Sequence, residues 1–397
     1  MFETPTMEAV RKQVVSQYGL APADVRVVVA PYRICPLGAH VDHQLGRVTA
    51  MTIDRAVNLA FAPSQNHEIR MTSLSFPGEV RFPLDRVPGK QPGDWGNYVR
   101  GAVKALSEKH ALRKGIVGVT AGSLSEGGLS SSAAFGVACL MALEAVNGLG
   151  VSRHDNILLD QKIENEYLGL RNGILDQAAI LLSRRGKLTC IDCRTQQHEL
   201  LASAKNMAPF AILLAFSGLT KSLVTTDYNR RVDECAAAAR ILLEALGRPR
   251  MPPQLGNISP EEYAQHKHHL SGAESRRAEH FFTEIARVAQ GIKAWQAGNL
   301  VEFGRLMTQS CASSIHNYEC GAPPLVTLYE LLISTPGVYG ARFSGAGFRG
   351  CCVALVDRTT AEDIARHVER KYKETIPELA PHAGVLLCQS DDGARIV

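Results

Sequence analysis

The sequence predicts an α/β protein made of two domains, residues 1–204 and 205–397. Three observations predict this fold class. Strand-like apolar runs alternate with segments of helical periodicity, 397 residues suffice for two domains of ordinary size, and the pattern changes near Ser203, where a new strand-like run follows. Apolar residues make up 45% of the chain, which is enough for a substantial core.

The first domain is expected to mix strands and helices. Apolar runs with strand character occur at 25–30, 48–53, 57–63, 67–73 and 115–123. Apolar residues at helical spacing occur at 7–18, 95–110, 131–146 and 152–167. The stretch 175–193 then contains the end of a helix and a further strand.

The second domain is expected to begin with a strand and three helices, at 209–218, 230–246, 273–297 and 300–311. Its C-terminal part contains a glycine-rich loop at 343–352 between strand-like runs, a helix from Ala361 and a final strand at 384–389. The proline-rich stretch 249–257 is expected to form a loop.

Composition and charge exclude several classes of protein. The formal net charge is +4, from 43 basic and 39 acidic residues, which is too balanced for a nucleic-acid binder. No run of about 18 apolar residues is present, so no membrane-spanning helix is expected. The polar N-terminus does not resemble a signal peptide. We therefore expect a cytoplasmic monomer or weak homo-oligomer with small-molecule partners, and neither nucleic-acid nor membrane partners.

The ten scattered cysteines indicate reduced thiols rather than a disulfide framework. Cys190 and Cys193 form a CxxC pair, but one such pair within a strand-like run is weak evidence for zinc. The histidines of HKHH, residues 266–269, lie in a polar segment without a cysteine partner, so a solvated helix or loop is the preferred interpretation.

A loop rich in glycine and serine, EGGLSSSAA at 126–134, is the most informative stretch. Glycines let the backbone curl around an anion, and the following helix points its free N–H groups and positive dipole end at that anion. A serine N-cap after a glycine turn is the alternative interpretation. No lysine follows the glycines, so the loop is not a Walker motif. The residues expected to contact a phosphate here are Gly127, Gly128, Leu129, Ser130, Ser131, Ser132 and Ala133.

A second glycine-rich loop, FSGAGFRGCC at 343–352, lies in the second domain between strand-like runs. By itself it is compatible with a tight hairpin or a bulge. Together with the first loop it suggests a nucleotide held between the two domains, with Gly345 and Gly347 among its contacts.

A third motif, ICPLGAHVDHQLG at 34–46, places two histidines and an aspartate in a loop that follows a buried strand. In their order along the chain, the three motifs resemble the GHMP small-molecule kinases, which include galactokinase, homoserine kinase and mevalonate kinase. The intervening IENEYLGLRNGILDQ and DCRT resemble the galactokinase branch. The resemblance spans nearly the whole chain. It implies two α/β domains with the active site in the cleft between them, and the use of ATP and Mg²⁺.

The resemblance also implies roles for individual residues. Arg33 corresponds to the arginine beside the reacting hydroxyl, Asp176 to the catalytic aspartate and Glu164 to the magnesium-binding glutamate. Trp95 and Tyr98 correspond to aromatic residues that line the adenine pocket. The positions that correspond to sugar-binding residues are His40, Asp42, Gly173 and Tyr228.

These residue types suit phosphoryl transfer, which needs positioning and charge neutralisation more than covalent help. Asp176 can orient and deprotonate the acceptor hydroxyl, and Arg33 can keep Asp176 ionised. Magnesium prefers oxygen ligands and retains waters, so Glu164 and Ser132 suffice beside the phosphates, with Ser131 as the alternative serine. A plain interdomain salt bridge between Arg33 and Asp176 is the alternative interpretation of that pair.

Ala39 departs from the galactokinase pattern GRxNLIGEHTDY, which has glutamate at this position. In galactokinases that glutamate accepts a hydrogen bond from the 6-hydroxyl of the sugar. Two carboxylates at ~4 Å repel by about 4 kcal/mol at an effective dielectric constant near 20. Ala39 is therefore interpreted as admitting a hexose oxidised at carbon 6. The candidate partners of the sugar carboxylate are Arg171, Lys221, Thr225, Thr226, Tyr228 and Arg349.

The function expected from these observations is ATP-dependent phosphorylation of the anomeric hydroxyl of D-galacturonate, which gives galacturonate 1-phosphate. One alternative is a kinase of galactose or of another hexose modified at carbon 6. Another is a non-catalytic sugar sensor on the same scaffold. The intact SSSAA loop, and the presence of Arg33, Glu164 and Asp176, favour an enzyme over a sensor.

Overall fold

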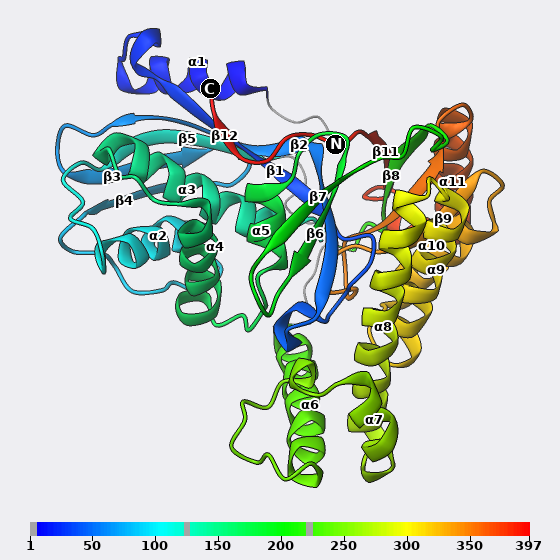
Figure 1. Cartoon of the computed structure of the whole chain (residues 1–397). Coiled ribbons are helices and arrows are strands. Elements are labelled where there is room, and N and C mark those ends of the chain that lie inside the picture. The colour runs from blue at the N-terminus through cyan, green and yellow to red at the C-terminus, as the bar shows by residue number, and fades with distance from the viewer. Residues whose placement is uncertain (1–5, 123–127, 220–224) are drawn as a thin grey trace.

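The computed structural model describes residues 6–122, 128–219 and 225–397, with the side chains of 225–227 excepted. Within this part of the chain the strands form an eight-stranded sheet and a four-stranded sheet, and helices pack against both (Figure 1). The α/β class predicted from the alternation of strand and helix patterns is confirmed.

The larger sheet has the strand order β12-β1-β2-β5-β3-β4, and β6 and β7 branch from β2. Its strands are β1 (Arg26–Ile34), β2 (Arg47–Pro63), β3 (Glu68–Ser73), β4 (Glu79–Pro83), β5 (Ile116–Gly122), β6 (Lys187–Asp192), β7 (His198–Ala202) and β12 (Arg395–Ile396). The sequence patterns did not predict β4, β7 and β12, which are short and lie at sheet edges.

The two strands predicted at 48–53 and 57–63 are one continuous strand, β2. The prediction separated them because Asp54 and Arg55 interrupt the apolar run, but the backbone remains extended across them. Strand β2 is long enough to pair with three other strands. It pairs with β1 along its middle, with β6 near its N-terminal end and with β5 near its C-terminal end.

Five helices belong to the first half of the chain: α1 (Met7–Tyr18), α2 (Asn97–Ser107), α3 (Ser131–Asn147), α4 (Arg153–Lys162) and α5 (Leu175–Leu182). Strand β1 is buried on both faces because helices cover both. Val27 and Val29 pack in the cluster that includes α1, whereas Val28 and Ala30 pack in the main core, which includes α3. This burial explains why β1 reads as an unbroken apolar run in the sequence.

The helix predicted at 152–167 is α-helical only as far as Lys162. It continues as a π-helical turn, Ile163–Leu168, which ends at Gly169 with φ 79°. A π turn is wider than an α turn and is frequent at functional sites. This one carries Glu164, which helical periodicity alone would have placed on a regular α-helix.

The smaller sheet has the order β11-β8-β10-β9, with β8 (Phe210–Phe216), β9 (Val338–Phe343), β10 (Cys351–Asp357) and β11 (Gly384–Cys388). The helices of this half are α6 (Thr225–Ala245), α7 (Pro260–His266), α8 (Gly272–Gln296), α9 (Leu300–His316), α10 (Pro323–Ser334) and α11 (Ala361–Thr375). In Figure 1, α6 and α7 extend away from both sheets. The sequence patterns did not predict α7 and α10.

The two halves are joined by more than the connecting chain. The C-terminal residues return to the larger sheet, where β12 pairs antiparallel with β1. Thr52 of β2 donates a hydrogen bond from Oγ1 to the carbonyl oxygen of Asp391 at 2.7 Å. A single hydrophobic cluster also contains residues of both sheets, such as Val28 and Leu214. These contacts restrict how the halves can move relative to each other.

All ten cysteines are buried and none forms a disulfide bond, as the sequence predicted. Among the helices of the described residues, none is long and apolar enough to cross a membrane.

The packing of α3 against α4 positions the π turn and depends on Gly136. A β-carbon built at Gly136 would lie 2.0 Å from Oδ1 of the fully buried Asp160 on α4. We expect Gly136→Ala to destabilise the protein by about 1–3 kcal/mol, the typical cost of overpacking a core. Chemical denaturation measures this change. Gly150→Ala is the control because nothing lies within 4 Å of the added carbon. Equal stability of the two variants would contradict this account of the helix packing.

Candidate active site

An ion pair between Arg33 and Asp176 lies where β1, α5 and the first glycine-rich loop meet. Nε and Nη2 of Arg33 each lie 2.7 Å from Oδ1 of Asp176. The third guanidinium nitrogen, Nη1, donates to the carbonyl oxygen of Gly128 at 3.2 Å. Arg33 is only 4% exposed. The structure therefore brings together the two residues that the sequence analysis paired, and it joins both to the loop expected to bind phosphate.

The Arg33 guanidinium stays charged although it is buried. Burial acts to lower its pKa, but the negative charge of Asp176 and weaker neighbouring groups outweigh burial, so the pKa is raised above its usual value. A buried cation held this way can balance one carboxylate and still offer a donor to an incoming anion. The pair therefore suits a base that must stay ionised beside a phosphate.

Asp42 of the third motif lies against the loop that precedes Asp176. Its Oδ2 accepts a hydrogen bond from the backbone N–H of Leu175 at 3.4 Å. A β-carbon at Gly173 would lie 2.6 Å from both Oδ2 and the carbonyl carbon of Asp42, so only glycine permits this approach. Burial, and then the charge of Asp176, raise the pKa of Asp42 to about 6. The absence of a side chain at Gly173 therefore allows the loop before Asp176 to pack against Asp42 of the third motif.

Glu164 points from the π turn into the same region. It accepts a hydrogen bond from Nδ2 of Asn172, and Ser132 also interacts with it. Its Oε1 is buried and has no hydrogen-bond partner among the described residues. Burial, and then the charge of Asp176, raise the pKa of Glu164 to about 7. The ionised form of Glu164 is therefore disfavoured in this environment, and a nearby cation would stabilise it.

A hard divalent cation fits the oxygens of Glu164 and Ser132. The unpartnered Oε1 of Glu164 is a free ligand position, and the Ser132 hydroxyl is next to it. No group of three or more His, Cys, Asp or Glu suited to a metal occurs in the described part of the chain. Magnesium needs no such cage, because it keeps several waters and binds through one or two protein oxygens together with substrate phosphates.

Asp160 is an acidic residue near this site that sequence reasoning missed. It lies on α4 one turn before Glu164 and is 0% exposed. Burial, and then the charges of Glu164 and Asp176, raise its pKa well above the usual value. Neither of its side-chain oxygens has a hydrogen-bond partner within the described residues. The only sequence signal was an acidic residue within an otherwise helical pattern.

The two glycine-rich loops are in contact. Ser344 donates from Oγ to the carbonyl oxygen of Gly128 at 3.0 Å. β-Carbons at Gly128 and Gly345 would lie 2.6 and 2.7 Å from backbone atoms of the opposite loop. Both glycines also have positive φ angles, 67° and 71°, which other residues rarely adopt. A third glycine, Gly347, has φ 77° and lies against Cys320. Loops from both halves of the chain thus meet, as the sequence suggested.

The predicted phosphate loop leads directly into α3, which begins at Ser131. Ser130 has φ 58°, in the left-handed region, and its buried hydroxyl has no hydrogen-bond partner in the described structure. Leu129 and Ala133 are fully buried, so the structure does not show how they would contact a nucleotide. Gly127 lies outside the described residues.

The two aromatic residues expected near adenine flank Phe135. The ring centroid of Phe135 lies 6.0 Å from Trp95 and 5.8 Å from Tyr98. Trp95 donates from Nε1 to the carbonyl oxygen of Pro77 at 3.2 Å. Tyr98 has its hydroxyl beside Ser132, and burial, followed by the charge of Glu164, raises its pKa. Tyr98 therefore lies close to Ser132 and Glu164 as well as to Phe135.

Two of the expected sugar-binding residues, His40 and Tyr228, belong to an aromatic group that also contains His43 and Tyr318. The ring of His40 stacks on Tyr318 with centroids 4.1 Å apart, and Nε2 of His43 lies 3.2 Å from the Tyr318 hydroxyl. Tyr228 packs edge-on against His43 at 6.2 Å. Burial is the main cause that lowers the pKa of His40 well below its usual value and that of His43 to about 4. Both rings are therefore neutral. Tyr318 was not among the residues that the sequence predicted to lie near the sugar.

Ala39 is buried, at 5% exposure, and comes directly before His40, whose φ is 60°. Of the candidate partners for a sugar carboxylate, Arg171 is already engaged. It donates from Nη1 and Nη2 to the carboxylate of Asp233 at 2.7 and 2.9 Å.

The structure describes some of the remaining candidate partners of a sugar carboxylate but not all of them. Arg349 lies near Tyr98, where its charge opposes in small part the rise in the pKa of Tyr98 that burial causes. Tyr228 lies near Asp42 and Asp176, whose charges contribute, after burial, to raising its pKa. Lys221 lies outside the described residues, and so do the side chains of Thr225 and Thr226.

Comparison with known proteins matches this geometry to one family. Residues 97–184 match the N-terminal domain of the GHMP kinases, and residues 291–374 match the GHMP kinase C-terminal domain. A galacturonokinase from Arabidopsis thaliana is 50% identical over 98% of both chains. A galactokinase from Roseiflexus sp. is 32% identical over 96% of this chain and 95% of its own. The chain belongs to the GHMP kinase family.

Solved structures agree with this assignment. The crystal structure of Lactococcus lactis galactokinase complexed with galactose matches with a TM-score of 0.90 at 29% identity, covering 98% of this chain and 99% of that one. A mevalonate kinase structure matches with a TM-score of 0.61 at 17% identity, covering 92% and 99%, which supports the fold alone. The predicted GHMP-kinase fold and the galactokinase branch are thereby confirmed.

The Arg33–Asp176 geometry predicts that Asp176→Asn removes catalysis without removing the nucleotide. The amide keeps the size and an acceptor for Arg33 but cannot take a proton. We expect kcat to fall by about 100- to 10,000-fold, the typical contribution of a general base. ADP release measures kcat, and calorimetry with a non-hydrolysable ATP analogue measures binding. Asp233→Asn, which alters only the partner of Arg171, is the control. Substantial residual turnover would contradict the role of Asp176.

The Glu164–Ser132 geometry predicts a defect specific to the metal. Glu164→Gln should raise the Mg²⁺ concentration for half-maximal activity by about tenfold or more, which corresponds to ~1.4 kcal/mol. Ser132→Ala should raise it less. The control is Glu166→Gln, because Glu166 is on the same turn but pairs with Lys162 at the surface. An unchanged Mg²⁺ titration in Glu164→Gln would show that Glu164 is not a ligand.

Proposed function

We propose that the chain transfers the γ-phosphoryl group of ATP to the anomeric hydroxyl of D-galacturonate, with Mg²⁺ as cofactor, to give ADP and galacturonate 1-phosphate. The observation that carries the choice of sugar is Ala39, which places a methyl group where the galactokinase motif has a carboxylate. The 50% identity to the Arabidopsis galacturonokinase supports the same substrate.

The geometry supports a direct transfer. Asp176 accepts the proton of the anomeric hydroxyl, and the sugar oxygen then attacks the γ-phosphorus while the bond to the β-phosphate oxygen breaks. Arg33 holds Asp176 and contacts Gly128, so it can also neutralise charge on the transferred group. The serine-rich loop and α3 offer N–H groups to the phosphates. Mg²⁺, held by Glu164 and Ser132, would neutralise negative charge on the phosphate oxygens.

The charged side chains in the cluster that holds the backbone of Ala39 favour an anionic sugar. This buried cluster contains one carboxylate, Glu284, and two guanidinium groups, Arg287 and Arg342. Two positive charges minus one negative charge leave the cluster at a formal +1. His280, also in the cluster, has its pKa lowered by burial and is neutral. A glutamate in place of Ala39 would cancel this excess, whereas alanine leaves it available to a carboxylate at carbon 6.

Galactose, or another hexose modified at carbon 6, is the second candidate substrate. The structural similarity to a galactokinase bound to galactose favours it, because the same fold accepts the neutral sugar. The decisive experiment is an ADP-release assay with galacturonate, glucuronate, galactose and glucose, with the 1-phosphate product identified by ³¹P NMR. We expect the highest kcat/KM for galacturonate. A higher kcat/KM for galactose would refute the proposed substrate, and no product with any sugar would refute the kinase.

The charge argument predicts the effect of Ala39→Glu. A repulsion of about 4 kcal/mol at ~4 Å corresponds to about a 1,000-fold loss, and solvent reduces it, so we expect the ratio of kcat/KM for galacturonate over galactose to fall at least about 100-fold. Ala39→Gln is the matched control because it adds the same volume without the charge. If the two variants lowered the ratio equally, volume rather than charge would set the selectivity.

A further inference from the structure

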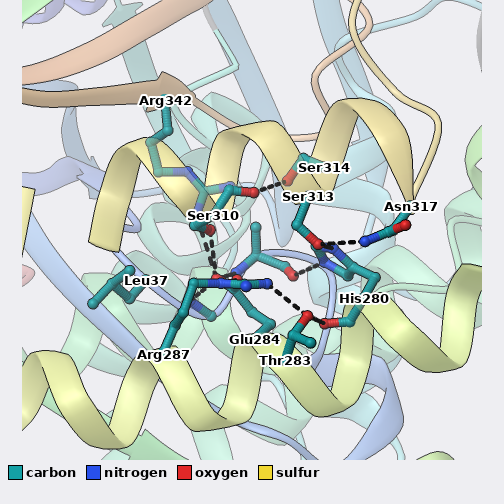
Figure 2. Close-up of polar contacts among 12 residues, drawn as sticks. Leu37, His280, Thr283, Glu284, Arg287, Ser310, Ser313, Ser314, Asn317 and Arg342 are labelled. Atoms are coloured by element: carbon teal, nitrogen blue, oxygen red, sulfur yellow. Dashed lines mark hydrogen bonds and ion pairs between the residues drawn. The ribbon is translucent and has the colours of Figure 1, made fainter. Parts of the chain in front are cut away.

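A buried polar cluster fastens the loop that carries Ala39 to helix α8 of the other half of the chain (Figure 2). Oε1 of Glu284 accepts hydrogen bonds from the backbone N–H groups of Gly38, at 2.7 Å, and Ala39, at 3.3 Å. His280, one turn earlier on α8, donates from Nε2 to the carbonyl oxygen of Ala39 at 2.9 Å. Three polar backbone atoms of Gly38 and Ala39 are therefore held by one helix.

The donors around Glu284 are arranged to hold its charge in place. Its Oε1 also accepts from Oγ of Ser310 at 2.6 Å, and its Oε2 accepts from Nε of Arg287 at 2.7 Å. Arg342 donates from Nη1 to Ser310 Oγ at 2.8 Å. Glu284, Ser310 and Arg342 are all essentially fully buried. Each side chain of the cluster is held by a hydrogen bond to the next, so the cluster is rigid. The Oε1 atom of Glu284, which accepts from the loop N–H groups, is therefore fixed in position.

The loop that carries Gly38 and Ala39 has little space in which to adjust if this cluster changes. A β-carbon at Gly38, whose φ is 99°, would lie 2.6 Å from Cα of Val48. The loop therefore fits between β2 on one side and Glu284 on the other. Shifting the carboxylate would move the two residues that precede His40, the ring that stacks on Tyr318. A pure packing role would not require an ionised acceptor on two consecutive N–H groups.

The cluster also reaches the loops expected to hold phosphate. Arg342 donates from Nε to the carbonyl oxygen of Phe343 at 3.1 Å, and the next residue, Ser344, donates to Gly128. Gly128 is the residue whose carbonyl oxygen also accepts from Arg33. A continuous series of contacts, buried or partly buried, thus connects the backbone of Ala39 with the meeting point of the two glycine-rich loops.

We propose that Glu284 is a positioning residue for the sugar, which fixes the backbone of Gly38 and Ala39 and thereby sets where the Ala39 methyl group and the His40 ring face the substrate. This inference rests on the proposed function, because it concerns the same sugar site. Glu284 acts through the loop and does not itself touch the sugar. It therefore determines sugar affinity and selectivity at carbon 6, and it leaves ATP binding to other residues.

The test is Glu284→Gln, which keeps the length and one carbonyl acceptor of the side chain but removes the charge. We expect KM for galacturonate to rise by about tenfold or more, as for a weakened hydrogen bond to a charged group. The preference for galacturonate over galactose should fall, and KM for ATP should stay unchanged. A variant that is merely less stable loses active enzyme, which lowers the apparent kcat but leaves the KM of the remaining enzyme unchanged.

Two further variants complete the experiment. Ser310→Ala removes one donor to Glu284 and leaves both loop N–H groups in place, so the sugar KM should rise in the same direction by a smaller factor. Glu144→Gln is the matched control. Glu144 is also a buried helical glutamate, but it bonds Asn156 at 3.1 Å and not the loop, so its substitution should leave the sugar KM unchanged.

The outcomes separate the positioning role from the proposed substrate. An unchanged sugar KM and an unchanged galacturonate preference in Glu284→Gln, with a lowered melting temperature, would reduce the cluster to a structural role and overturn the inference. If the wild-type enzyme instead prefers galactose, the proposed substrate fails. The positioning role is then judged by the KM for galactose in the same three variants, where a rise confined to Glu284→Gln and Ser310→Ala supports it.

Discussion

The contact of Arg33 with both Asp176 and Gly128 is the constraint on which the rest of the site depends. One buried guanidinium uses two nitrogens on the carboxylate and the third on the loop, so β1, α5 and the first glycine-rich loop must meet at one point. Leaving a buried charge unpaired costs about 3–5 kcal/mol, so separating Arg33 from Asp176 would strongly destabilise the fold. Asp176 and the first glycine-rich loop are therefore positioned by a single side chain.

Around this junction, three acidic groups are held in surroundings that disfavour their charge. Asp42, Asp160 and Glu164 all have raised pKa values, with burial as the main cause and Asp176 as a contributor. Such a group is tolerated where a cation or a proton resolves the repulsion during function. For Glu164 the free Oε1 and the neighbouring Ser132 indicate a cation. Asp160 is fully buried, and burial raises its pKa well above the usual value.

Under the proposed function, selectivity and catalysis would be carried by different parts of the molecule. Asp176 and Arg33 belong to the first half of the chain, and they would serve any sugar with a reactive hydroxyl at that point. The atoms around Ala39 are set by the second half, through Glu284 and His280 on α8. Because the second half of the chain holds the loop that carries Ala39 and Asp176 belongs to the first half, the relative position of the halves would set the distance between Asp176 and a sugar bound at that loop.

The sequence by itself determined the α/β class and the order of the three motifs, because strand and helix periodicity and glycine-rich turns are local properties. It also identified Ala39 as the departure from the galactokinase pattern. Only the tertiary structure decided that 48–53 and 57–63 are one strand, that a π turn carries Glu164, and that Tyr318 stacks on His40. It alone placed Glu284 on the backbone of Gly38, 246 residues away along the chain. Such contacts depend on how distant segments pack, and no local pattern in the sequence records that packing.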